Sequence, residues 1–166
     1  LAINGAGFFV LALPDGQTGY TRLGTFRPDA EGRLVTEQGA LLVPPITVPL
    51  AVGQTAVDAR GVITAVVGEA SKVIGQIQLA QFANPEGLVS AGDGIYLPSA
   101  ASGPVIMGEP AQNGLGQIVA GALEISNVDT GSQLVGMLRV QRSYGLTLKA
   151  LQVSDQMLAI TNEISA

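Results

Sequence analysis

The sequence predicts an antiparallel, mainly β domain over residues 1–123, followed by one long C-terminal α-helix within residues 124–166. In the first part, 19 of the 22 Gly and all nine Pro separate short runs rich in Val, Ile, Leu, Phe and Thr, which is typical of strands joined by tight turns. In the second part, apolar residues recur at intervals of three and four, which is the period of a helix. We therefore expect two structural units, one built of strands and turns and one helical.

The β region opens with a predicted hairpin. Residues 8–13 run into Pro14-Asp15-Gly16 and residues 18–22 return, because Pro presets φ for a turn and Gly accepts a positive φ. Residues 46–48 lie between prolines, which predicts a short segment at a sheet edge, since Pro cannot donate to a strand ladder. Residues 98–114 contain three Pro and predict an irregular connection. Further strands are expected at residues 33–36, 62–67, 73–82, 95–97 and 115–123.

The segment 73–82 has the alternation of a strand with one buried face. Val73, Ile77 and Leu79 share one parity, whereas Gln76 and Gln78 share the other. We expect the apolar set to pack against the core and the glutamines to face water.

The C-terminal segment predicts an unusually long helix. Asp129 or Thr130 can cap its N-terminus, and no Pro interrupts roughly 36 residues, which would span about 54 Å as one helix. The mean globular helix has only about 11–12 residues. One 3,4-spaced series, named stripe 1, has the pattern of an interrupted coiled-coil seam and comprises Leu134, Met137, Gln141, Tyr144, Leu148, Leu151, Asp155 and Leu158. A second series, stripe 2, comprises Leu146, Ala150, Val153, Met157, Ile160 and Ile164.

Two apolar stripes on one helix favour packing between molecules. A helix with a single stripe commonly folds back onto its own domain, but a small domain cannot cover two faces over this length. Gly136 and Gly145 each weaken the helix by about 1 kcal/mol relative to Ala. We expect the segment to become fully ordered only when other helices pack on it.

Composition excludes several classes of function. The chain has no Cys and no His, which removes thiol nucleophiles, Ser-His-Asp triads and imidazole or thiolate metal sites. A net charge of -5 disfavours binding to nucleic acid. No apolar run reaches the length of a membrane span, so membrane insertion is not expected.

Candidate chemical motifs are weak. Gly5-Ala6-Gly7 and Gly114-Leu115-Gly116 each begin a dinucleotide-loop pattern, but Val replaces the third Gly in both, so turns are expected instead. Four Asp residues lie at or near Gly in turns, where local hydrogen bonding favours them, namely Asp15, Asp29, Asp58 and Asp93. We expect no catalytic residues, no cofactor and no metal. Only a deep pocket lined by several of these Asp residues would revive an enzymatic interpretation.

Several motifs resemble the bacterial flagellar rod and hook proteins. They occur in the family's order at residues 1–10, 13–16, 20–26, 121–128, 141–144 and 155–158. Residues 46–49, 78–80 and 82–88 are most similar to the distal-rod branch of the family. The chain starts with Leu and lacks the family's N-terminal helix, so we expect it to be a piece of a longer protein.

The resemblance implies a non-enzymatic structural subunit of the basal-body rod. Its copies would polymerise helically into the axle that carries torque from motor to hook, with the β domain outside and residues 124–166 in the inner tube. The implied partners are further copies, other rod proteins, the hook protein and the surrounding rings. It also implies a periplasmic basal-body location, reached through the flagellar type III apparatus without a cleaved signal.

The assembly interface is expected on the helix. Its candidate residues are Leu134, Met137, Leu138, Gln141, Arg142, Tyr144, Leu148, Leu151, Val153, Asp155, Met157, Leu158 and Ile160. The alternative is a secreted or phage-tail-like β domain that binds carbohydrate or protein, with the helix as an oligomerising tail.

Overall fold

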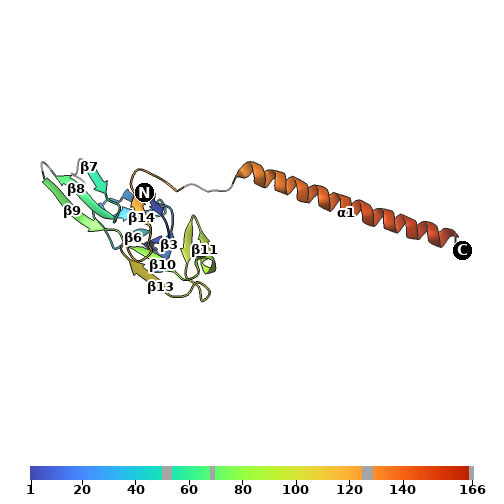
Figure 1. Cartoon of the computed structure of the whole chain (residues 1–166), viewed down its shortest axis with the longest axis horizontal. Coiled ribbons are helices and arrows are strands. Elements are labelled where there is room, and N and C mark those ends of the chain that lie inside the picture. Colours follow the sequence, from blue (N-terminus) through green and yellow to red (C-terminus); the bar gives the residue numbers. More distant parts are fainter. Residues whose placement is uncertain (50–53, 68–69, 125–128, 165–166) are drawn as a thin grey trace. The chain divides into compact units, whose positions relative to one another are not determined.

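The computed structural model describes residues 1–49, 54–67, 70–124 and 129–164. The chain divides into two compact units, Leu1–Glu124 and Ile125–Ala166. The first unit is built from antiparallel sheets, and the second contains one helix, α1 (Thr130–Ile164) (Figure 1). The predicted fold class is confirmed.

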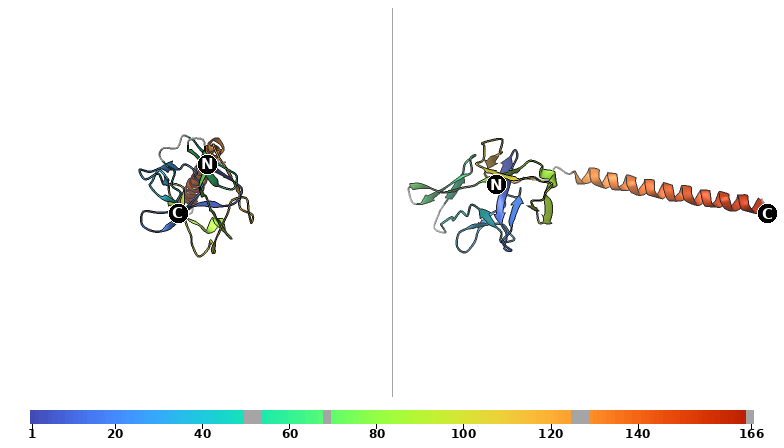
Figure 2. Two further views of the ribbon diagram at one scale, coloured as in Figure 1. Left: turned by 90° about the vertical axis from the view of Figure 1, so that its left-hand side faces the viewer. Right: turned by 90° about the horizontal axis from the view of Figure 1, so that it is seen from below.

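The β unit contains short strands in three sheets. In chain order these are β1 (Ala2–Asn4), β2 (Phe8–Ala12), β3 (Thr18–Thr21), β4 (Arg27–Pro28), β5 (Leu34–Val35), β6 (Leu41–Val43), β7 (Gln54–Val57), β8 (Val62–Val67), β9 (Ala70–Gln76), β10 (Leu79–Phe82), β11 (Val89–Gly92), β12 (Ile95–Leu97), β13 (Val105–Gly108) and β14 (Gln117–Val119), with a 3-10 helix, η1 (Pro85–Gly87), before β11. The main sheet has the order β11-β12-β3-β2-β6-β5-β4, and β10 joins it by pairing with both β2 and β13. Strands β7, β8 and β9 form a ribbon that projects from one end of the unit (Figures 1 and 2).

The predicted first hairpin is confirmed as β2 and β3. Val10 lies opposite Tyr20, and the turn closes where the Gly16 amide donates to the Leu13 carbonyl at 3.0 Å. Residues 46–48 run beside residues 32–34, with an isolated antiparallel bridge between Thr47 and Arg33. The Leu34 amide donates to the Ile46 carbonyl at 3.1 Å, and the Val48 amide donates to the Gly32 carbonyl at 2.7 Å.

The prediction of one continuous strand over residues 73–82 is wrong. The segment belongs to β9 and β10, which pair in different sheets. A register shift within β9 places Val73 opposite Thr64 and Gly75 opposite Ile63. Because a bulge reverses which face the next side chains occupy, Val73 is 59% exposed although Ile77 is fully buried.

The prediction of an irregular connection over residues 98–114 is also wrong in part, because β13 lies within it. This strand pairs with β10, with Val105 opposite Phe82. The strand expected over residues 115–123 is shorter, Gln117–Val119, and pairs with β1, which the sequence did not predict. Both pairings join segments far apart in the chain, so no local pattern marks them.

The core of the β unit draws on many segments at once. Its main buried cluster comprises Ile3, Phe9, Leu42, Ile46, Ile63, Ile77, Leu79, Leu115 and Ile118. The Phe9 ring packs edge-on against Phe26 with centroids 5.1 Å apart. A smaller cluster on the main sheet contains Val10, Tyr20, Ala80 and Phe82.

The backbone conformation at Gly5 and Gly7 requires glycine. Their φ angles are +121° and +128°, a region that other residues rarely adopt. A Cβ on Gly5 would also lie 2.8 Å from the Cα of Gly116, because the two backbones approach closely there. The motif forms the connection between β1 and β2, in which Ala6 makes an isolated bridge with Leu115.

Candidate assembly surface

The helix begins at an acidic cap. The Asp129 carbonyl accepts from the Gln133 amide at 3.1 Å, and its carboxylate accepts from the Gly131 amide at 3.0 Å and the Ser132 hydroxyl at 2.7 Å. Of the two caps that the sequence allowed, Asp129 supplies the side-chain bonds. The Ser132 hydroxyl, followed by the backbone amides of Gly131 and Ser132, holds the pKa of Asp129 below its ordinary value.

Because of this cap, we expect the helix to be less stable in acid. The carboxylate has a lower pKa in the helix than in the unfolded segment, so its stabilising effect is complete above about pH 4 and is lost as the pH falls through the lowered folded value. We expect helical circular dichroism of the full chain to decrease below pH 4. Asp129→Asn keeps a capping side chain without a charge, so it should show a smaller decrease over the same range. Equal acid profiles for the two proteins would contradict the assignment.

The described apolar side chains of α1 are exposed. The exposed fraction is 45% for Leu148, 58% for Leu151 and 67% for Tyr144 in stripe 1, and 50% for Val153 in stripe 2. The other large apolar stripe residues described as exposed are Leu134, Met137, Leu146 and Met157. A single helix has no interior, so these side chains can leave water only against another element.

The two stripes lie on nearly opposite sides of the helix. Leu148 and Ala150 are two residues apart, which corresponds to roughly 200° of rotation about the axis. The helix remains continuous through Gly136 and Gly145. Burial of both stripes therefore requires other structural elements to pack on two sides of the helix.

The remaining predicted interface residues fall into two groups. Leu138, Gln141 and Arg142 are exposed on the described part of the helix. The side chains of Asp155, Leu158 and Ile160 lie outside the described residues, although the backbone there is helical.

Two exposed apolar residues were missed by the sequence analysis, Val135 and Val140, at 49% and 69% exposure. Val135 continues the 3,4 spacing of stripe 2 toward the N-terminus through Arg142 and Arg139. The two charges interrupt the apolar pattern and obscure it.

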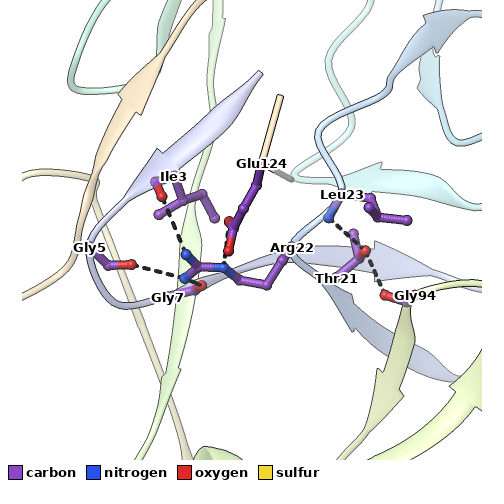
Figure 3. Close-up of polar contacts among 8 residues, drawn as sticks. All are labelled: Ile3, Gly5, Gly7, Thr21, Arg22, Leu23, Gly94 and Glu124. Carbon is purple, nitrogen blue, oxygen red and sulfur yellow. Dashed lines mark hydrogen bonds and ion pairs between the residues drawn. The ribbon is translucent and has the colours of Figure 1, made fainter. Parts of the chain in front are cut away.

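A polar cluster of the β unit is centred on Arg22 (Figure 3). Its guanidinium donates to the carbonyls of Gly5 at 2.9 Å, Gly7 at 2.8 Å and Ile3 at 3.3 Å, and to the Glu124 carboxylate at 2.9 Å. Arg22 belongs to the family motif at residues 20–26, but nothing in the sequence indicated its role. Backbone carbonyls are present at every residue, so the sequence carries no signal for these contacts.

A cavity of about 400 Å³ lies beside this cluster. Its walls are mostly apolar, with Phe8, Phe82, Leu88 and Tyr96. None of the four turn Asp residues lines it.

Three of the four turn Asp residues bond backbone amides within their own turns. The Asp15, Asp29 and Asp58 carboxylates accept backbone amide bonds from residues two positions later, at 2.9–3.0 Å. Asp93 has a φ of 51° at its turn. The bonds of Asp15, Asp29 and Asp58 are local turn contacts, as the sequence predicted.

Within the described residues, no group of three or more acidic side chains could hold a metal ion, and α1 lacks the apolar length needed to traverse a bilayer.

The fold and the surface together define a class of protein: a compact β domain joined to a helix whose apolar residues face two sides.

Comparison with known proteins identifies the family. Residues 2–65 match the family described as flagellar hook protein FlgE/F/G D1 domain, and residues 119–164 match flagellar basal body rod FlgEFG protein C-terminal. The flagellar basal-body rod protein FlgG of Buchnera aphidicola is 42% identical, covering 95% of this chain and 62% of the relative. FlgG of Caulobacter vibrioides is 37% identical over 99% of this chain and 63% of the relative. The flagellar hook protein FlgE of Salmonella typhimurium is 42% identical over 54% of this chain and 22% of the relative.

The chain belongs to the flagellar basal-body rod and hook protein family and is of the FlgG type, since FlgG relatives match it nearly end to end. It spans less than two thirds of the length of these FlgG relatives.

Proposed function

We propose that this chain is part of a non-enzymatic structural subunit of the flagellar basal-body rod. In this proposal, copies polymerise helically, with residues 124–166 in the inner tube and the β domain outside. The polymer is the axle that transmits torque from the motor to the hook.

One observation carries the proposal most directly. Leu134, Tyr144, Leu148 and Leu151 follow one side of a helix that has apolar residues on its other side too, and all four are exposed. Exposed apolar surface on two faces of one helix is costly in water and is relieved when neighbouring helices pack on both. A helical polymer supplies such neighbours to every copy.

The proposal extends to partners and location. Neighbouring copies, other rod proteins, the hook protein and the surrounding rings would contact the subunit. Its position would be the periplasmic part of the basal body, in the distal rod, after export through the flagellar type III apparatus without a cleaved signal. The names of the FlgG and FlgE relatives support the assembly role.

A truncation tests this role. Deleting residues 129–166 removes α1 but leaves the described core of the β unit intact. We expect the truncated chain to keep the cooperative unfolding of the β unit and to lose incorporation into rod assemblies formed with full-length rod subunits. Incorporation would be scored by electron microscopy and sedimentation.

The control variant is Ser154→Ala, which keeps the helix and removes one hydroxyl group. This variant should incorporate like the parent chain. Undiminished incorporation of the truncated chain would overturn the proposed role of the helix.

A further inference from the structure

Three segments that are far apart in the sequence meet at one side chain. Arg22 lies directly after β3 and binds Ile3, Gly5 and Gly7, which belong to β1 and to the connection between β1 and β2. It also binds Glu124, the last residue of the β unit (Figure 3). A single guanidinium therefore ties the start of the unit to its end.

The geometry depends on arginine. Its planar fork presents five donors at fixed angles, whereas a lysine ammonium is a compact charge without such a fork. The Arg22 and Glu124 side chains are 27% and 40% exposed, so water screens the ion pair only in part. The bonds to three carbonyls hold the guanidinium in place, and the Glu124 carboxylate is fixed against a donor that is already positioned.

This contact shortens the connection to the helix. The last residue of the β14 ladder is Val119, and α1 begins at Thr130, so ten residues separate them. With Glu124 held, only five residues, 125–129, lie between the fixed point and the helix. At the extended limit this reduces the reach from roughly 38 Å to roughly 20 Å.

We propose that Arg22 is a positioning residue that fixes the point from which the chain leaves the β unit toward α1. This role of Arg22 does not depend on what the helix binds. Neither core packing nor the helix surface accounts for this motif residue.

The absence of Cys from the chain permits a direct test by spin labelling. Leu123 is 57% exposed and precedes Glu124, so Leu123→Cys can carry a nitroxide label beside the contact. In the unassembled full chain we expect an immobilised spectral component at this position. Glu124→Ala and Arg22→Ala should each remove that component, because the segment loses its fixed point.

Two controls make the result specific. A label at the exposed Thr18 in β3 should give the same spectrum in every variant. Glu31→Ala removes an acidic partner from an exposed ion pair with Arg33 and should leave the label at position 123 unchanged.

Unchanged spectra at position 123 in Glu124→Ala would overturn the proposal. An equal change at position 18 would also overturn it, since that would mean general loosening of the unit. If Arg22→Ala fails to fold, Glu124→Ala decides alone, because it leaves the carbonyl contacts of Arg22 in place. The labels are read before any assembly, so failure of the rod proposal would not alter this outcome.

Discussion

Replacing Leu148 and Leu151 together with Asp is expected to abolish helix-driven assembly. Both side chains are exposed in α1 and belong to stripe 1. Burial of a Leu in an interface contributes about 1.5–3 kcal/mol, so the loss of two amounts to about 3–6 kcal/mol before the cost of burying two charges. This corresponds to a roughly 10²–10⁴-fold increase in the dissociation constant, measurable by sedimentation with full-length rod subunits.

The matched control adds the same charge elsewhere on the helix. Thr147 and Ser154 are exposed and lie off both stripes, so Thr147→Asp with Ser154→Asp should weaken assembly far less. Circular dichroism should confirm equal helix content in the two double variants. Equal loss of assembly in both would mean that net charge, rather than the apolar stripe, governs the association.

Truncation of Leu42 to Ala is expected to cause a large loss of stability in the β unit. Leu42 is fully buried in the main core cluster, at the centre of β6. Removing a buried Leu side chain costs about 2–5 kcal/mol, because the transfer energy is lost and a cavity remains. For a unit of this size, Tm should fall by roughly 8–20 °C. The unfolding would be measured by near-UV circular dichroism of the tyrosines.

Leu23→Ala is the matched control because it removes the same atoms from a side chain that is 46% exposed. We expect a loss of about 1 kcal/mol or less. Similar losses for Leu23 and Leu42 would contradict the assignment of the core. Neither change touches α1, so the helix should respond only to the stripe substitutions.

The parts of the fold that were predicted correctly depend on local chemistry. The turn at Pro14-Asp15-Gly16 and the 3,4 spacing along α1 depend only on residues that are close together in the sequence. For the same reason the turn role of Asp15, Asp29 and Asp58 could be predicted, since each carboxylate bonds an amide two residues away.

The errors arose where distant segments or a bulge decide the outcome. Val73 lies on the predicted apolar face but is exposed, because the register of β9 shifts beside it. Strand β1 was not expected, and its partner β14 follows more than 100 residues later. Such pairings depend on the packing of the whole sheet, so the sequence of either segment alone does not predict its partner.

By itself, the sequence determined the division into a β unit and a long helix, and it determined which helix residues are apolar, because helical period and turn chemistry are properties of neighbouring residues. Only the tertiary structure decided that Arg22 joins Ile3, Gly5 and Gly7 to Glu124. Three of its four partners are backbone carbonyls, which every residue possesses, so their meeting at one guanidinium follows from the folded path of the chain and not from residue type.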